Sequence, residues 1–426
     1  MQLVEQHLVR KNDPRYPVID AAAFASKNLY NQAMYQIRQA FIHEGKYLPY
    51  AEVFHRVKHM DCYKALPAKI ANSILILVHK NWVSFFKALE AYQLDPSKFL
   101  ARPRIPGYKD KQRGRNILIY DTQALGKRHF KKTGKLVPSG LPIEIETCIT
   151  EWRQLAQVRI VPLPDGYMME VVYEQQEEQA EGDTRLAAAL DPGVDTLAAL
   201  TSNKPGFGPL LVNGRPLKSE NQFYNKQRAS YQRLLPEGQH TSHRLTSMTT
   251  KRTRRVNAYL HTASRRIIEV LIEEGISTLV LGKNPRWKQE VNLGKQNNQQ
   301  FVQLPHARFL DMLTYKAHLV GITVLFQEES YTSKASFLDR DPIPVYDPKR
   351  TEKPQFSGKR EYRGLYRAKD GRRIHADVNG SYNILRKALP NSFGQGIVAP
   401  AVVAKAVEVV RKEGTGSSVN GNRPNG

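Results

Sequence analysis

The stretch RLAAALDPGVDTLAALTS (residues 185–202) decides the fold of the second half of the chain. Two runs of small and branched apolar residues lie on either side of Pro192 and Gly193, and this pattern predicts a strand, a turn and a second strand. Asp191 closes the first run. An acidic residue in that position either opens the turn or belongs to a site at the mouth of the strand.

The residues that follow extend this pair of strands into a mixed α/β domain. We expect a third strand over 209–217, a long basic helical segment over 220–274, strands over 277–284 and 322–330, a helix between these two over 305–321, and a closing helix over 375–389. This order is that of an RNase H-like fold, in which the first strand is central. The last two strands are then expected beside it, in parallel.

Acidic residues stand where this fold brings strand ends and the last helix together. They are Asp191 on the first strand, Glu328 or Glu329 at the end of the fifth, and Asp377 in the first turn of the closing helix. Phosphodiester hydrolysis needs an activated water and a stabilised leaving oxygen, which two divalent cations about 3.5–4 Å apart can supply. Mg²⁺ or Mn²⁺ suits carboxylate ligands, and crowded carboxylates repel one another unless cations neutralise them. Singly, each acid has an ordinary explanation as a turn, strand-end or helix-cap residue, but the combination favours a metal-dependent nuclease.

Charge is the strongest compositional signal. Lys and Arg number 64 and Asp and Glu number 40, so the formal net charge is 64 − 40 = +24 in 426 residues. Such an excess favours a polyanionic partner, through phosphate contacts and counterion release. The two cysteines, Cys62 and Cys148, exclude a disulfide framework and a four-cysteine zinc site, and they fit a reducing, cytoplasmic compartment. We expect no membrane association, because no apolar run is long enough to span a bilayer and the N-terminus lacks a signal-peptide core.

The first half of the chain predicts a helical domain and a small β domain. Apolar residues at helical spacing across 15–100, among them Phe24, Leu29 and Ile37, indicate helices. Short strand-like runs separated by turns across 101–182 indicate a small β-barrel or sandwich, which the alternating segment 1–14 is expected to join. At the other end, the small and polar composition of 393–426 predicts a disordered tail.

Several stretches together resemble the TnpB family, which consists of transposon-encoded, RNA-guided DNA nucleases related to the type V CRISPR effectors. They are ALDPGVDTLAALTS (189–202), the block from LVLGKN (279–284) to YKAHLVGI (315–322), EESYTSKASFLD (328–339) and HADVNGSYNIL (375–385). The likeness covers most of the chain, and the block from GKN to YTSKASF is highly specific.

The resemblance implies a layout and a function. The layout is a wedge β-barrel over 1–14 and 101–182, a helical recognition domain over 15–100, a RuvC nuclease domain over 183–331 and 375–392, and an inserted target-binding lobe over 332–374. The function is that of an RNA-guided DNA endonuclease of a transposable element, working as a monomeric ribonucleoprotein in a prokaryotic cytoplasm. Its partners would be a guide RNA derived from the transposon end and double-stranded target DNA with a short adjacent motif.

The sequence departs from the family at the second of its three RuvC carboxylates. Asp191 matches the first and Asp377 the third, but Gly282 stands where many members carry Glu. Either a neighbouring glutamate serves instead, or this member cannot cut DNA. The fifth strand lies only about 4.8 Å beyond the fourth, and members with GKN here resemble a branch in which the Glu before YTS substitutes. We therefore predict Asp191, Glu329 and Asp377 as catalytic and metal-binding residues, with Glu328 as the alternative to Glu329.

The inserted lobe also departs from the family. Many relatives carry two cysteine pairs in it, whereas YTSKASFLDRD (331–341) has Ala335 and Ser336 at the corresponding place. No structural zinc is expected there. A small core is expected to replace the metal, built from the aromatic residues Phe356, Tyr362 and Tyr366.

Basic segments over 102–115, 127–135 and 251–266 are predicted to line a positive channel for nucleic-acid backbones. The last of them has no acidic residue, unlike an ordinary solvated helix, and four of its polar residues fall near one helical face. The residues predicted to bind nucleic acid are Lys27, Asn28, Asn31, Gln32, Lys251, Arg254, Arg255, Asn257, His261, Arg265, Asn284, Trp287 and Lys288.

Two other functions are consistent with the sequence. A cleavage-deficient RNA-guided DNA-binding protein or repressor would keep the channel and lose the chemistry, and Gly282 motivates this alternative. A structure-specific resolvase would use the same carboxylates without RNA. Retention of Asp191 and Asp377 argues for an active nuclease.

Overall fold

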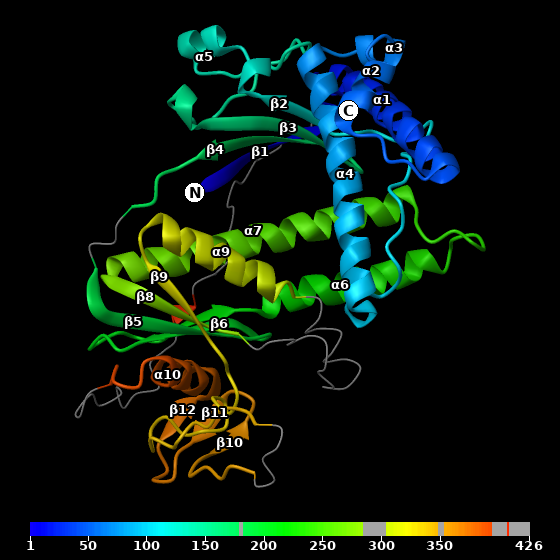
Figure 1. Cartoon of the computed structure of the whole chain (residues 1–426). Helices are drawn as coiled ribbons and strands as arrows, with labels where there is room; N and C mark the ends of the chain where they lie inside the picture. The colour runs from blue at the N-terminus through cyan, green and yellow to red at the C-terminus, as the bar shows by residue number, and fades with distance from the viewer. Residues whose placement is uncertain (179–181, 284–303, 348–352, 394–406, 409–426) are drawn as a thin grey trace, which may run out of the picture. The chain divides into compact units, whose positions relative to one another are not determined.

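The computed structural model describes residues 1–178, 182–283, 304–347, 353–393 and 407–408 (Figure 1). The chain divides into two compact units, residues 1–176 and 177–426. The predicted contacts Asn284, Trp287 and Lys288, and the predicted tail apart from residues 393, 407 and 408, lie outside the described residues. Residues 407 and 408 form a short strand, so the prediction of a disordered tail is wrong for these two residues.

The first unit begins with a strand and continues into helices, as the periodicity of 15–100 predicts. The helices are α1 (Tyr16–Glu44), α2 (Tyr50–Val57), α3 (Asp61–Lys64) and α4 (Ala68–Leu94), followed by the short 3₁₀ helix η1 (Pro96–Lys98). Residues at helical spacing on α1, such as Ile19, Ala23 and Ile37, are buried. Trp82 of α4 lies in an aromatic cluster with Phe41 and Phe86. Burial of these large side chains stabilises the helical part.

A four-stranded antiparallel sheet completes this unit. Its order is β1-β4-β3-β2, with β1 (Gln2–Arg10), β2 (Leu118–Asp121), β3 (Leu155–Leu163) and β4 (Gly166–Glu174); the short helices η2 (Thr122–Ala124), α5 (Lys127–Thr133) and η3 (Trp152–Gln154) lie between β2 and β3 in the chain. The N-terminal strand joins the sheet, as predicted, by pairing with β4.

Two expectations for this sheet are corrected. In the described residues the sheet is open, because β1 and β2 form its two edges and do not pair with each other. The run LPIEIET (141–147) is not a strand; its apolar residues Leu141, Ile143 and Ile145 are buried, but only the isolated bridge from Leu136 to Ile145 forms. One hydrophobic core includes both the helices and the sheet.

The second unit is built on a six-stranded mixed sheet in the order β13-β7-β6-β5-β8-β9. Its strands are β5 (Asp183–Pro192), β6 (Thr196–Ser202), β7 (Leu210–Asn213), β8 (Ile276–Gly282), β9 (Thr323–Gln327) and β13 (Val407–Glu408). β5 pairs antiparallel with β6 and parallel with β8, and β8 pairs parallel with β9. β5, the first strand of the unit, is therefore one of the two central strands of the sheet. The two strands parallel to it, β8 and β9, lie on one side of it, as the sequence predicts.

Helices cover both faces of this sheet. They are α6 (Arg215–Gln232), α7 (His243–Glu273), α9 (His306–Leu319) and α10 (Ala376–Ala388). Figure 1 shows α7 and α9 on one side of the sheet and α10 on the other. Ala188 and Leu190 belong to the core shared with α7 and α9, whereas Ala187 and Ala189 pack in the core with Ile384 of α10. The alternation of β5 thus places consecutive side chains on opposite faces.

The long basic helical segment predicted over 220–274 is two helices. α6 ends at Gln232 and α7 begins at His243, after a turn that contains Pro236 and Gly238. Pro236 cannot continue a helix, and Gly238 has a positive φ of 76°, which glycine adopts without a steric cost. The side chain of Ser242 accepts a hydrogen bond from the backbone N–H of Leu245 and so caps α7.

The inserted lobe holds a three-stranded antiparallel sheet of β10 (Lys359–Tyr362), β11 (Leu365–Arg367) and β12 (Arg373–His375). Tyr366 is buried and its hydroxyl donates to the carbonyl of Lys334 at 2.8 Å, and Phe356 packs 6.1 Å from the ring of Tyr331. The prediction for Tyr362 is wrong, because two thirds of its side chain is exposed.

Hydrogen bonds to Asp341 hold the segments of this lobe together. Its carboxylate accepts from the backbone N–H of Ser336 at 2.8 Å, and from the backbone N–H and hydroxyl of Ser357 at 3.0 and 2.7 Å. Asp339 Oδ2 also lies 2.9 Å from the Ser357 hydroxyl, which can donate to only one of the two carboxylates at a time, and it accepts from the backbone N–H of Lys369 at 2.9 Å. A network of hydrogen bonds around the buried Asp341 therefore organises the part of the lobe in which relatives are expected to bind zinc.

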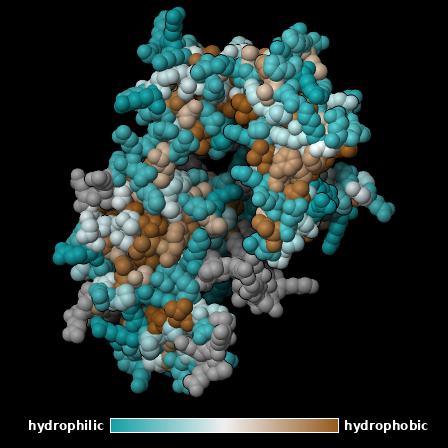
Figure 2. Space-filling view, viewed as in Figure 1, coloured by the Kyte–Doolittle hydropathy of each residue, from teal (hydrophilic) through white to brown (hydrophobic). Residues whose placement is uncertain are grey.

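None of the helices in the described residues is both long and apolar enough to cross a membrane. Figure 2 shows a viewed face on which hydrophilic residues predominate, with separate hydrophobic patches between them. The two cysteines are both free, Cys62 partly buried and Cys148 exposed.

Candidate active site

Asp191 lies near the C-terminal end of β5, paired across the sheet with Ala199. Its carboxylate rests against α10 at Gly380, where an added Cβ would stand only 2.5 Å from Asp191 Oδ2. The adjacent Ser381 fixes this approach, because its hydroxyl donates to the carbonyl of Ala189 at 2.8 Å. Gly380 is therefore the residue that lets the last helix approach the carboxylate so closely.

Glu329 follows β9 by two residues and occupies the space above Gly282, the last residue of β8. A Cβ built on Gly282 would stand 2.1 Å from Glu329 Oε1 and 2.9 Å from Ile384 Cδ1. A side chain at position 282 and the observed position of Glu329 are thus mutually exclusive. The glycine at the end of β8 makes room for a carboxylate that comes from the neighbouring strand.

Glu328 is held away from this space by a different set of contacts. Lys387 Nζ of α10 lies 2.6 Å from its carboxylate, and the backbone N–H of Ser330 donates to it at 2.7 Å. Burial opposes ionisation of Glu328, but the bonds from Lys387 and Ser330 outweigh it and lower its pKa. The structure therefore separates the two neighbouring glutamates, which alternation along the strand could not.

Asp377 lies in the first turn of α10, where His375 accepts a hydrogen bond from its backbone N–H at 3.3 Å. Its side chain is about one third exposed and forms an ion pair with Arg360 of β10 at 3.4 Å. It also lines a pocket of about 520 Å³, together with Asp195, Arg215, Arg360, Arg363 and His375. The third predicted acid is therefore accessible from a pocket that carries three arginines.

The electrostatics join these acids around Asp191. Burial raises the pKa of Asp191, the charge of Asp377 raises it further, and Arg360 partly opposes both. Burial also raises the pKa of Glu329, and the charges of Asp191 and Glu328 add to that effect. Asp191 therefore links the other two predicted ligands, because Asp377 raises its pKa and its own charge raises the pKa of Glu329.

The donor set fits a hard divalent cation, because it consists of carboxylate oxygens whose repulsion such a cation would relieve. The carboxylates are nevertheless not gathered around one point. In the described part of the chain, no group of three or more His, Cys, Asp or Glu residues stands close enough to hold a metal ion. The glycines at 282 and 380 provide the close approaches from which such a site could be completed.

Two of the predicted nucleic-acid contacts on α1 are used inside the protein. Lys27 is 2% exposed, and its ammonium donates to the carbonyl of Lys111 at 2.7 Å and lies 3.8 Å from the ring of Phe24. The prediction that Lys27 contacts nucleic acid is therefore corrected: its side chain stabilises the fold instead. Asn31 exchanges two hydrogen bonds of 2.9 Å with the backbone of Lys109.

The other residues predicted on α1 and α7 differ in their surroundings. Asn28, Lys251, Arg255, His261 and Arg265 are exposed, and Gln32, Arg254 and Asn257 are partly buried. The segment 251–266 has no acid of its own, but acids from elsewhere reach it: Arg255 pairs with Glu220 at 3.0 Å and Arg265 with Glu269 at 2.8 Å. Asn257 accepts a hydrogen bond from Arg308 at 2.7 Å.

Several residues of the site were missed by sequence reasoning. They are Arg360 and Lys387, which pair with the acids, and the buried Asn379, Ser381 and Asn383 of α10. Asn379 Nδ2 and Asn383 Nδ2 donate to the carbonyl of Ala335 at 2.8 and 2.7 Å. The stretch DVNGSYN (377–383) could have indicated them. Asn, Gly and Ser are poor helix formers, so several of them inside a helix suggest that they are needed for specific contacts.

Two family models match parts of the chain. One is OrfB_IS605, described as a probable transposase, over residues 170–288. The other is the Cas12f1-like TNB domain, over residues 306–384. The matched ranges include all three predicted acids and Gly282.

The chain is also similar to individual proteins. It is 23% identical over 405 residues to the TnpB-like protein ORF457 of Acidianus two-tailed virus, which covers 85% of this chain and 82% of the relative. Among solved structures it is similar to Cas12f1 in a complex with sgRNA and target DNA, with 14% identity, a TM-score of 0.47 and coverage of 86% and 82% of the two chains. A second is the mini-RNA-guided endonuclease CRISPR-Cas_phi3, with 9% identity, a TM-score of 0.42 and coverage of 94% of both chains.

Proposed function

The chain is a member of the TnpB family, and from this premise we propose that it is an RNA-guided DNA endonuclease encoded by a transposable element. Its mixed sheet would be the core of a RuvC nuclease domain, and the sheet of its first unit would be the wedge. The partners are a guide RNA derived from the transposon end and double-stranded DNA with a short adjacent motif. The strong positive charge of the chain suits both partners.

The observation that carries an active nuclease is the fit between Gly282 and Glu329. Loss of a glutamate from β8 would by itself favour a cleavage-deficient protein. The space above Gly282 is instead filled by the carboxylate of Glu329. The end of β8 thus lacks a side chain at the place where the segment after β9 supplies a carboxylate. This complementarity supports a relocated ligand, because a decayed site has no reason to retain it.

The chain's own residues would supply the metal ligands of the site and hold them in position. Asp191, Glu329 and Asp377 would hold Mg²⁺ or Mn²⁺, which when bound activates a water and stabilises the leaving oxygen of the phosphodiester. Thr332 fixes the loop after β9, since its N–H and hydroxyl donate to the carbonyl of Glu329 at 3.2 and 2.8 Å. Lys387 neutralises Glu328 and so keeps that carboxylate from competing for the same place.

Cleavage of a supercoiled target plasmid by the purified protein–RNA complex in Mg²⁺ tests this proposal. Glu329→Ala should abolish cleavage, whereas Glu328→Ala should retain it, because only Glu329 faces Asp191. The exchange variant Gly282→Glu with Glu329→Gly returns the carboxylate to β8 and should recover cleavage relative to Glu329→Ala. Equal activity of Glu329→Ala and the wild type would refute the assignment.

The second candidate is an RNA-guided DNA-binding protein that does not cut. The spacing of the three acids favours it, because they do not group tightly enough to hold a metal ion in the described residues. This protein would bind guide RNA and retard target DNA while leaving the plasmid intact in both Mg²⁺ and Mn²⁺. We expect one chain per guide RNA, which light scattering of the complex would measure.

A further inference from the structure

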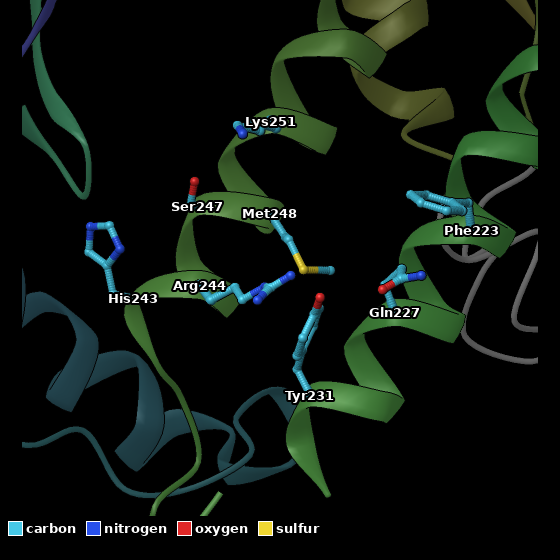
Figure 3. A pocket seen from close by; sticks show the side chains of 8 residues that line it. All are labelled: Phe223, Gln227, Tyr231, His243, Arg244, Ser247, Met248 and Lys251. Carbon is cyan, nitrogen blue, oxygen red and sulfur yellow. The ribbon is translucent and has the colours of Figure 1, made fainter. Parts of the chain in front are cut away.

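A pocket lies between α6 and α7, on the hairpin that these two helices form (Figure 3). Its volume is about 460 Å³, within the range of roughly 300–1,000 Å³ typical of small-ligand sites. The residues that line it are Phe223, Gln227, Tyr231, His243, Arg244, Ser247, Met248 and Lys251. None of the predicted catalytic acids belongs to it.

The hairpin is locked in register on one side of this pocket. Arg252 Nε donates to Asn221 Oδ1 at 2.7 Å, and the hydroxyls of Tyr224 and Thr249 are 2.8 Å apart. These bonds join the two helices beside the pocket, since Tyr224 and Arg252 are the neighbours in sequence of the lining residues Phe223 and Lys251. The pocket thus extends along the hairpin from these bonds toward the connecting turn.

The lining combines aromatic faces, an amide and cations, without a carboxylate. Phe223 is 59% exposed, although it is a large apolar side chain on a surface helix. Figure 3 shows Arg244 and Met248 projecting from α7 toward Gln227 and Tyr231 of α6. The guanidinium of Arg244 lies 4.2 Å from the centroid of the Tyr231 ring. An aromatic and guanidinium surface of this kind stacks on planar rings.

We propose that this pocket binds one unpaired nucleobase of a single-stranded nucleic acid. The base stacks on Phe223, the amide of Gln227 meets its polar edge, and Lys251 and Arg244 face its phosphates. A purely apolar ligand would leave these cations unused, and a base inside a duplex is already stacked and cannot enter. The inference rests on the proposed function only in taking nucleic acid as the partner.

Fluorescence polarisation of the full-length protein tests the proposal in EDTA, where no cleavage occurs. The probes are labelled oligouridylate, labelled oligothymidylate and an abasic oligomer with the same number of phosphates. Phe223→Ala should weaken binding of a base-containing probe about tenfold, as the loss of one stacked base predicts. Binding of the abasic probe should not change, and Phe223→Trp should bind as the wild type does.

A separate pair of variants tests whether the cations that line the pocket contribute to binding. Arg244→Ala removes a cation that lines the pocket and Arg228→Ala removes an exposed cation of α6 that does not. The first should weaken binding of base-containing probes more than the second. If Phe223→Ala weakens binding of the uridylate alone, the pocket binds RNA, and if it weakens binding of the thymidylate alone, the pocket binds DNA. An effect on both probes shows that the pocket accepts either strand. Each of these three results supports the proposal.

The proposal is overturned if Phe223→Ala leaves binding of both base-containing probes unchanged, or weakens the abasic probe equally. It is also overturned if the wild type binds none of the probes. The proposed function fails separately, in the plasmid assay, because cleavage by the guide RNA complex does not require Phe223 to stack on a base. Since the Phe223 side chain is mostly exposed, its removal leaves the core of the hairpin intact.

Discussion

At the scale of single residues, ionisation of Asp191 is opposed by its burial and by the charge of Asp377, so that its pKa is raised. A carboxyl whose pKa is raised on folding binds protons more tightly in the folded state than in the unfolded state. Stability is therefore highest below the pKa of the unfolded state, and it falls as pH rises through the raised pKa of the folded state. Bound divalent cations would remove this loss.

Asp191→Asn should consequently raise the melting temperature of the metal-free protein. At pH 8 in EDTA we expect a rise of about 2 °C or more. In the plasmid assay with Mg²⁺, the same variant should not cleave. Asp183→Asn, at the other end of β5, is the matched control, because Arg185 lowers the pKa of Asp183 to about 2 and ionisation there is favourable. Differential scanning fluorimetry from pH 5 to 9 measures both. A lower melting temperature for Asp191→Asn would contradict the prediction.

Gly282→Ala should disturb the site by a single methyl group. The new Cβ would overlap Glu329 Oε1 and crowd Ile384, so the carboxylate must move. We expect cleavage to fall at least about tenfold and the free energy of unfolding to fall by about 1–3 kcal/mol, the usual cost of overpacking. Gly208→Ala is the control, because its added methyl meets open space. Unchanged cleavage by Gly282→Ala would show that Glu329 works from another position.

At the scale of elements, the order of strands and helices along the chain was sufficient to predict the central place of β5 and the two parallel strands beside it, but not β13, which lies in the segment predicted to be disordered. The buried runs of β8 and β9 predict strands that lie parallel to β5, because helical segments come between them in the chain. The choice between Glu328 and Glu329 could not be predicted in this way, because alternation assigns opposite faces without naming them. It depends on the space above Gly282 and on Lys387, which is 59 residues away in the chain.

Burial of polar residues was the other feature that the sequence did not show. Lys27 reads as a surface cation of α1, but its partner is a carbonyl 84 residues away. The break between α6 and α7 likewise departs from the local pattern. In each case a contact distant in sequence, or one proline and one glycine, outweighs a local pattern.

The inserted lobe should depend on Asp341 as relatives would depend on a metal. Asp341→Ala leaves the buried backbone N–H of Ser336 without its acceptor, which costs about 1–3 kcal/mol, and it also removes the acceptor of the backbone N–H of the exposed Ser357. We expect faster hydrogen exchange in residues 334–341 and 357–367, measured by mass spectrometry, with the central sheet unaffected. Asp370→Ala is the control, since Asp370 pairs with its exposed neighbour Arg372. Equal exchange in the two variants would exclude an organising carboxylate.

At the scale of the whole molecule, the formal net charge of +24 makes nucleic-acid binding strongly dependent on salt. Each phosphate that a cation neutralises releases counterions, so the logarithm of the binding constant falls linearly with the logarithm of salt concentration. The slope therefore counts the cations that reach phosphates, and it separates them from cations that serve only the fold. Lys251 and Lys27 represent these two kinds, one exposed on α7 and the other buried in α1.

Lys251→Ala should reduce the slope for guide RNA by about 0.7–0.9, the contribution of one phosphate contact. Lys27→Met should leave the slope unchanged, because the ammonium of Lys27 is bonded to the carbonyl of Lys111. Filter binding or fluorescence polarisation across a salt series measures both slopes, and thermal melting shows that each variant is folded. If Lys27→Met reduced the slope as much as Lys251→Ala did, the side chain of Lys27 would leave its buried position when RNA binds, and α1 would be part of the interface after all.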